Sequence, residues 1–396
     1  GTRNVALGAY ANQEGTTGDD NVYVGYAAGA ATTTSSDNTA VGSYALQANT
    51  TGHSNVAVGY AALDANTTGI GATALGFNAA TTMTTGGAET VAIGFEALKA
   101  ATLTGNTAVG YKAGTVVSTG EDNTFLGAFS GVATTTASNN TGIGFNVLGA
   151  NSTGANNTAV GYSALDANTT AANNTAVGRD SLGANTTGAQ NTAVGQSAGL
   201  GITTGTYNSA FGYQSMNTGS TTGSYNTAYG AQSAQAMTTG ASNIAVGNSA
   251  LTANTTGASN VAVGESALTA NTTASNNVAV GQSALTANTT GASNVGVGYQ
   301  SLLTNTTGAE NTALGKAALY SNTTANSNVA IGKNALLNNT TGATNTAVGT
   351  NALDANTTAD NNTAVGYGSL GLNTTGTGKR QHRNGGISFR AEHYWS

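Results

Sequence analysis

Residues 157–161 read Asn-Thr-Ala-Val-Gly, and this pentapeptide begins a repeat of about seventeen residues that recurs along the whole chain. Counted from Asn4 to Asn362 there are twenty-two repeats, and eighteen of the twenty-one steps between them are seventeen residues long. We number each repeat from its first residue, so that the pentapeptide occupies positions one to five. Regular short repeats are typical of a solenoid. The sequence therefore predicts an all-β, parallel β-solenoid of about 17 residues per coil and 22 coils.

The composition favours an ordered repeat protein. The 396 residues include 57 Gly, no Pro and no Cys, with 39% hydrophobic and 7% charged residues. Glycine recurs at fixed positions, as in the turns of a solenoid. The absence of cysteine excludes disulfides and thiolate metal sites, and the net charge of −6 argues against a nucleic-acid partner. No apolar run approaches the roughly eighteen residues that span a bilayer, so we expect no membrane insertion within this chain.

Alternation within the pentapeptide predicts a short strand with two faces. Position four is apolar in every repeat, from Leu7 to Val365, and position two is usually Val or Thr. We expect this face to point into the core. Position three is Ala almost throughout, and we expect the alanine face to pack against another chain. Because each coil offers few large apolar groups, neighbouring chains are expected to complete the core.

Further positions predict the corners and the far side of each coil. Position five is Gly in all twenty-two repeats, which fits a corner that needs positive φ. Position one is Asn in twenty repeats, and stacked amides can hydrogen-bond along the solenoid axis. We expect a second short strand with Leu at position nine as its core residue. Four repeats have Gly there, and three of these are expected to bury the next apolar residue instead: Val116, Val132 and Leu200.

The heads at 55–59, 260–264 and 328–332, each followed by an Ala-Leu segment, resemble the head repeats of trimeric autotransporter adhesins of the YadA type and similar repeats in phage tail fibres. The resemblance covers residues 4 to about 376. It implies a left-handed β-roll with three chains side by side, located extracellularly, on a cell surface or on a virion. The repeat here is longer than in most adhesin heads, and no neck, stalk, anchor or chaperone is recognisable. Bacterial adhesin, phage fibre and free filament therefore stay open.

The residue after the glycine corner, at position six, is the most informative surface position. It is aromatic in ten repeats and charged in others, as at Arg179 and Glu265, so we expect it to be at least partly exposed. Such a stripe suits glycan stacking or contact with a protein. The structural alternative is that these side chains line the edge of an interface between chains, with the ring packed and the hydroxyl group in water. The candidate contacts for a host-surface glycan or protein are Tyr26, Tyr60, Tyr111, Tyr162, Tyr213, Tyr299 and Tyr367, with Phe77, Phe95 and Phe145 in the same position.

No arrangement of residues indicates an enzyme. His53, His382 and His393 are isolated, and the Asp-bearing turns lack the glycine pattern of calcium-binding rolls, so we expect no catalytic residue, cofactor or metal. Turns that read Asn-Thr-Thr match the N-glycosylation pattern, but we explain them by turn chemistry, because Asn tolerates a left-handed backbone and Thr hydroxyl groups cap the turn. These asparagines include Asn66, Asn168, Asn254, Asn305 and Asn356. Ice binding is disfavoured because the two adjacent threonines point to opposite sides.

The composition changes near Gly378, which predicts a repeat rod over 1–377 and a basic, aromatic tail over 378–396. Alternation from Ile387 to Ala391 predicts a strand. The tail could cap the open end of the roll, dock on another subunit to build a head-to-tail polymer, or begin a further domain. The candidate docking residues are Arg380, Arg383, Ile387, Phe389, Arg390, Tyr394 and Trp395.

Together these features predict a non-enzymatic extracellular or virion structural fibre that acts as a rod-like spacer with an adhesive surface. We expect a homo-oligomer, with a trimer favoured by the resemblance. The alternatives are a self-polymerising filament and a glycan-binding module that uses the aromatic stripe. Because the chain begins at Gly1, inside the first repeat, we expect it to be a mature or trimmed segment.

Overall fold

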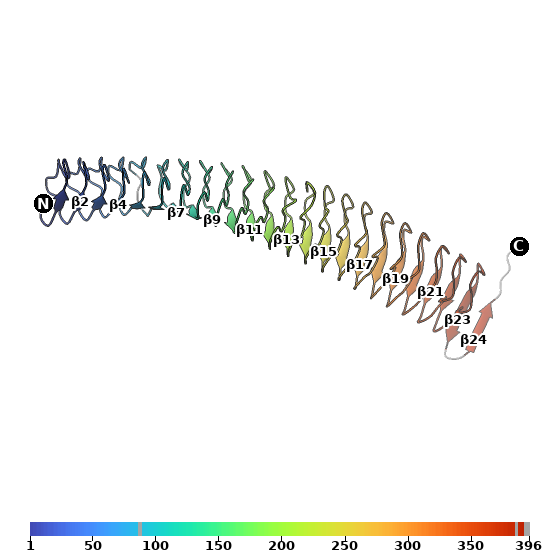
Figure 1. Cartoon of the computed structure of the whole chain (residues 1–396). Helices are drawn as coiled ribbons and strands as arrows, with labels where there is room; N and C mark the ends of the chain where they lie inside the picture. The colour runs from blue at the N-terminus through green and yellow to red at the C-terminus, as the bar shows by residue number, and fades with distance from the viewer. Residues whose placement is uncertain (86–88, 385–386, 392–396) are drawn as a thin grey trace. The chain divides into compact units, whose positions relative to one another are not determined.

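The computed structural model describes residues 1–85, 89–384 and 387–391. It divides into two compact units, which we call the N-terminal half (Gly1–Thr204) and the C-terminal half (Gly205–Ser396). Each half is a stack of coils, and each repeat contributes one strand of three residues (Figure 1). The predicted fold class is therefore confirmed as an all-β parallel β-solenoid of about seventeen residues per coil and about 22 turns.

The strands occupy positions two to four of the repeats. The N-terminal half contains β1 (Val5–Leu7), β2 (Val22–Val24), β3 (Thr39–Val41), β4 (Val56–Val58), β5 (Thr73–Leu75), β6 (Val91–Ile93), β7 (Thr107–Val109), β8 (Thr124–Leu126), β9 (Thr141–Ile143), β10 (Thr158–Val160), β11 (Thr175–Val177) and β12 (Thr192–Val194). The C-terminal half contains β13 (Ser209–Phe211), β14 (Thr227–Tyr229), β15 (Ile244–Val246), β16 (Val261–Val263), β17 (Val278–Val280), β18 (Val295–Val297), β19 (Thr312–Leu314), β20 (Val329–Ile331), β21 (Thr346–Val348), β22 (Thr363–Val365), β23 (Arg380–Asn384) and β24 (Ile387–Ala391).

Within each half, neighbouring repeat strands pair in parallel and in register. Thr158 lies opposite Thr175, and Val261 lies opposite Val278, so equivalent side chains form continuous ladders along each stack. The tail extends the ladder of its own half, because β23 pairs in parallel with β22 and β24 pairs in antiparallel with β23. The strand predicted over 387–391 is therefore confirmed.

The two faces of the repeat strands are the reverse of the prediction. Position three is buried in every repeat after the first, as at Ala159 and Ala279, whereas positions two and four point outward and are half-buried or exposed. Each coil is thin, and the leucine and asparagine side chains of its far side fill the interior. Little more than a methyl group fits opposite them. The prediction of a Val/Thr core and an external alanine face was wrong for this reason.

The far side of each coil is a turn rather than a second strand. Positions seven and nine take left-handed backbone, for example Ser266 at φ 57° and Leu268 at φ 51°. This segment still hydrogen-bonds to the next coil, since the amide of Leu268 donates to the carbonyl oxygen of Ala284 at 3.0 Å. A left-handed leucine is strained by about 1–2 kcal/mol. Its fully buried side chain offsets that strain.

Coils with Gly at position nine fill their core by another route. In two of them position three is large, and a Cβ on Gly29 or Gly131 would lie 2.4 Å from the ring of Tyr23 or Phe125 in the same coil. In the other two, position twelve holds a buried Val117 or Ile202. The predicted substitutes are not the core residues: Val116 is 40% exposed, and Val132 and Leu200 are half-buried.

Both predicted corner positions are confirmed. Position-five glycines have φ between 113° and 143°, and a Cβ on Gly161 would lie 2.5 Å from the carbonyl oxygen of Gly178 in the next coil. Conformation and close stacking therefore both require glycine. The position-one asparagines are buried after the first repeat and form hydrogen bonds along the solenoid axis. For example, the backbone amide of Asn277 donates to the side-chain Oδ1 of Asn260 at 3.0 Å.

The asparagine of the Asn-Thr-Thr turn, at position twelve, forms a second internal ladder. Asn288 donates through Nδ2 to Oδ1 of Asn271 at 3.0 Å and to the carbonyl oxygen of Gly291 at 2.9 Å. The left-handed backbone predicted for these asparagines was wrong, because the left-handed residues lie at positions seven, nine and seventeen. The five asparagines named above for the glycosylation pattern are fully buried, which keeps them from a modifying enzyme in the folded chain.

Candidate functional site

Positions two and four of the repeat strands form a surface that we call the outer strand face. Position two is Val, Ile or Thr in every repeat except Ser209, and position four is aliphatic except at Phe211 and Tyr229. Many of these side chains are well exposed, for example Val56 at 40% and Leu314 at 48%. Because the strands stack in register, the face is continuous within each half.

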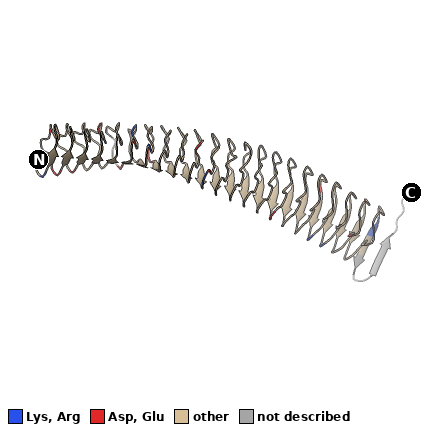
Figure 2. Ribbon diagram, viewed as in Figure 1, with Lys and Arg blue, Asp and Glu red and all other residues tan. Residues whose placement is uncertain are grey.

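The outer strand face contains no charged residue within the repeats, and the first charge in register with it is Arg380 of β23, opposite Thr363. Neither position two nor position four carries Lys, Arg, Asp or Glu in any repeat, and no charged residue occurs from Ser181 to Gly264 (Figure 2). Residues 1–204 contain four basic and eleven acidic residues, a net charge of −7. The N-terminal half is therefore acidic overall but presents an uncharged strand face.

Beyond the glycine corner, ten aromatic side chains form a row that we call the aromatic ladder. Neighbouring rings contact one another with centroids 5.2–5.8 Å apart and are either stacked or edge to face. In order along the N-terminal half, the rings are Tyr10, Tyr26, Tyr44, Tyr60, Phe77, Phe95, Tyr111, Phe129, Phe145 and Tyr162.

The ladder contains seven of the ten aromatic residues predicted at position six, and three residues that were not predicted. Tyr26, Tyr60, Tyr111 and Tyr162 belong to it, together with the three predicted phenylalanines. Three members were missed because they stand at position seven, directly after a small residue at position six: Tyr10, Tyr44 and Phe129 follow Ala9, Ser43 and Ala128. The sequence alone shows this pattern of a small residue at position six followed by an aromatic residue at position seven.

Three predicted tyrosines stand apart from the ladder. Tyr213, Tyr299 and Tyr367 are 49%, 44% and 71% exposed, so their predicted exposure is confirmed. Adjacent repeats carry no aromatic residue at position six or seven beside them. They are therefore isolated rings in the C-terminal half.

The few cations near the ladder are engaged. Nζ of Lys112 lies 5.5 Å from the ring centroid of Tyr111 and 3.7 Å from Oε2 of Glu96. Nζ of Lys99 donates to the other carboxylate oxygen of Glu96 at 2.7 Å. The hydrogen bond from Lys99 lowers the pKa of Glu96. Arg179 lies over the last ring, Tyr162, at 5.8 Å and contacts Asp180 at 3.0 Å.

The tail strands continue the sheet of their own chain, with β23 beside β22 and β24 beside β23. Arg380 and Arg383 belong to β23, and three further candidates, Ile387, Phe389 and Arg390, belong to β24. Gln381 fixes this junction, since its Oε1 accepts the amide of Leu370 at 2.6 Å. The two remaining candidates, Tyr394 and Trp395, lie outside the described residues.

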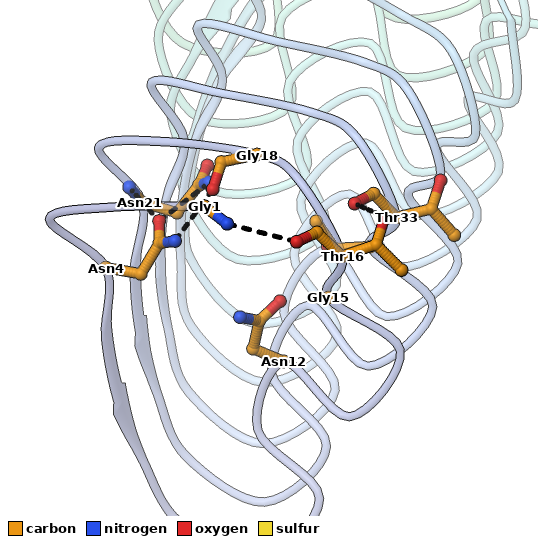
Figure 3. A pocket seen from close by; sticks show the side chains of 9 residues that line it. Gly1, Asn4, Asn12, Gly15, Thr16, Gly18, Asn21 and Thr33 are labelled. Atoms are coloured by element: carbon orange, nitrogen blue, oxygen red, sulfur yellow. Dashed lines mark hydrogen bonds between the residues drawn. The ribbon is translucent and has the colours of Figure 1, made fainter.

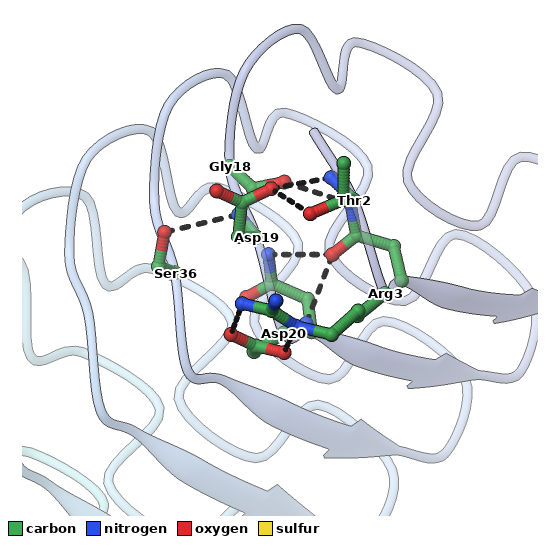
Figure 4. Close-up of polar contacts among 8 residues, drawn as sticks. Thr2, Arg3, Gly18, Asp19, Asp20 and Ser36 are labelled. Carbon is green, nitrogen blue, oxygen red and sulfur yellow. Dashed lines mark hydrogen bonds and ion pairs between the residues drawn. The ribbon is translucent and has the colours of Figure 1, made fainter.

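Polar contacts join the first two coils. A cavity of about 140 Å³ is bounded by these two coils, and Asn4 donates there to the carbonyl oxygen of Gly18 at 2.7 Å (Figure 3). Nearby, Arg3 pairs with Asp20, and the Thr2 amide donates to Asp19, whose own amide donates to Ser36 (Figure 4). These contacts tie one coil to the next.

Within the described ranges, no three His, Asp or Glu side chains come close enough together to hold a metal ion. No helix in the same ranges has the length and apolar character needed to cross a bilayer. No protein-family model matches the chain, and no curated protein is significantly similar to it. The structure therefore defines a parallel β-solenoid repeat protein with two outward features, the outer strand face and the aromatic ladder.

Proposed function

We propose that the chain is a non-enzymatic structural fibre of the extracellular space, a cell surface or a virion, in which the stacked coils act as a spacer and present an adhesive surface. The buried positions support this proposal, because they are used for stacking: asparagine at positions one and twelve, alanine at three and leucine at nine. The resemblance of the repeat to trimeric adhesin heads and phage tail-fibre repeats supports the same function.

The observation that carries the proposal is the outer strand face. Its position-four row is apolar in every repeat, whereas position two is Thr or Ser in thirteen of the twenty-two. Continuous exposed rows of apolar side chains are uncommon on monomeric proteins and mark sites of association. Since the alanine positions are buried inside the coil, they are unavailable as the interface that the sequence predicted. We infer that copies of the chain associate through the outer strand face, with a trimer favoured by the resemblance.

Light scattering of a charged variant tests this function. Val263→Lys with Val280→Lys places two cations on neighbouring strands of the outer strand face, where self-association would have to bury them. We expect the solution mass to fall from a sharp value near three chains to one chain. In the matched control, Thr256→Lys with Thr273→Lys, the substituted residues are at the exposed position fourteen and the mass should not change. A single-chain mass for the unaltered protein would refute the proposed assembly.

The head-to-tail filament has less support. It needs the tail to pair with another copy, whereas β23 and β24 extend the ladder of their own chain. A broad, concentration-dependent mass for the unaltered protein would favour the filament over a closed oligomer.

A further inference from the structure

We propose that the aromatic ladder binds a linear neutral polysaccharide, with successive sugar rings lying on successive coils. This inference goes beyond the fibre function and does not depend on self-association. Its first support is the continuity of the ladder over ten coils. Where position six is small, position seven supplies the ring instead, as at Ser43 and Tyr44, and the ring contacts continue without a gap.

Coil stability does not require a ring at this corner. Several coils of the C-terminal half place Gln282, Lys316 or Thr350 at position six and form the same strands and turns. The unbroken row in the N-terminal half is therefore a feature added to the fold. A row of rings at one face suits a ligand that is itself extended.

The geometry leaves the rings available to a ligand. Between Phe77 and Phe95 the centroids are 5.2 Å apart and the planes differ by 8°. This separation exceeds the contact distance of about 3.5–4.0 Å between carbon atoms, so the stacked rings are offset and part of each face stays uncovered. Phe77 and Phe95 accordingly remain 43% and 39% exposed. The apolar C–H face of a pyranose ring packs on such a surface.

The repeat distance fits a polymer of sugars. Neighbouring rings of the ladder have centroids 5.2–5.8 Å apart, which is close to the advance per residue of an extended pyranose chain. Successive sugars can therefore meet successive rings, and weak contacts add up along a single ligand. Six of the ten rings are tyrosines, whose hydroxyl groups can hydrogen-bond to sugar hydroxyls.

Charge selects a neutral polymer. The N-terminal half has a net charge of −7, and the cations beside the ladder are already paired, Lys112 with Glu96 and Arg179 with Asp180. An acidic polysaccharide, a nucleic acid or an anionic membrane would be repelled. A neutral polysaccharide meets no such penalty.

Affinity electrophoresis in native gels tests the proposal, with glucomannan, xyloglucan and a soluble β-1,3-glucan as neutral probes and alginate as the acidic probe. The ladder variant carries Tyr60→Gln, Phe77→Gln and Phe95→Gln, because Gln occurs naturally at position six. The matched control carries Tyr213→Gln, Tyr299→Gln and Tyr367→Gln. We expect at least one neutral probe to retard the full chain, the ladder variant to bind about tenfold more weakly or worse, and the control to bind within about twofold of the unaltered chain.

Several results would overturn the proposal. These are no retardation by any neutral probe, preference for alginate, or equal losses in the ladder variant and the control. A fall in the solution mass of the ladder variant would make the ladder an interface between copies and would also overturn it. Circular dichroism checks the fold of both variants, and the single substitution Phe77→Gln provides a milder test with the same expected direction. Because the lysine variants of the outer strand face test self-association separately, either idea can fail alone.

Discussion

Asp64 and Asp166 occupy position ten of their coils and are half-buried, and burial raises the pKa of both carboxyl groups. Repulsion from Asp180 adds to the shift at Asp166. Asp20 is the opposite case, since the hydrogen bond from Arg3 lowers the pKa of its carboxyl group. These two kinds of carboxyl group affect stability with opposite dependence on pH.

We predict that Asp166→Asn stabilises the chain at neutral pH. A raised pKa means that the folded chain binds a proton more readily than the unfolded chain, so this group's contribution to stability falls as pH rises through the carboxyl range. The amide removes that loss. Urea unfolding followed by circular dichroism should give a higher midpoint for the variant at pH 7, and the difference should vanish once the carboxyl group is protonated in both states.

Asp20→Asn provides the control, because this substitution should lower the urea midpoint at pH 7. Its carboxylate favours folding above the unfolded pKa, and that contribution disappears as pH falls through the folded value. A lower midpoint for Asp166→Asn at pH 7 would show that burial does not penalise this carboxylate.

At the residue scale, the sequence was sufficient where the requirement is local. Glycine at position five and asparagine at position one could be predicted because each is set by a corner that repeats unchanged. The role of Asn288 could not, because its partners are Asn271 in the preceding coil and Gly291 three residues later. Only the stacked structure separates a buried amide ladder from an exposed turn.

At the scale of the single coil, positions three and nine share one space. Large residues at position three, Tyr23 and Phe125, occur in coils with Gly29 and Gly131 at position nine. Tyr23 also has a polar partner, since the hydroxyl group of Thr32 donates to its phenolic oxygen at 3.2 Å. The interior therefore has a fixed capacity that either side of the coil can fill.

Placing the residues of the second coil at positions three, nine and twelve of a regular coil tests whether positions three and nine share one space. Ala279→Tyr alone should destabilise the chain by about 3 kcal/mol, because the ring overpacks the space held by Leu285. Adding Leu285→Gly and Asn288→Thr should restore most of the loss, since the triple variant reproduces the second coil. Urea unfolding of the single, double and triple variants measures the coupling. Additive losses would contradict the shared-space interpretation.

The same capacity explains why the strand faces were assigned in reverse. Hydrophobic alternation identified the strand correctly, but it favoured Val280 as the buried side and Ala279 as the outer side. In a thin coil the small residue is inside, because Leu285 already occupies the centre. Size complementarity across the coil, which the pattern of one strand does not contain, decides the orientation.

At the scale of the whole molecule, the C-terminal end of the strand stack decides whether a further copy can add to that end. In the C-terminal half, the amide of Thr363 donates to the carbonyl oxygen of Lys379 at 2.8 Å, and the amide of Lys379 donates to Oδ1 of Asn362 at 2.8 Å. β23 then continues the pairing. Removing the tail would leave the backbone of β22 without these partners, and an uncovered strand edge can pair with another chain.

We therefore predict that deletion of residues 379–396 increases association. The variant should form larger, concentration-dependent particles by light scattering, because the exposed edge of β22 replaces lost hydrogen bonds with those of a second copy. A shorter deletion of 392–396 keeps β23 and β24 and should leave the mass unchanged. If deletion of 379–396 instead dissolves polymers that the unaltered protein forms, the tail docks on a neighbouring copy and the capping role is wrong. The comparison separates the two roles because a cap and a docking strand change the solution mass in opposite directions.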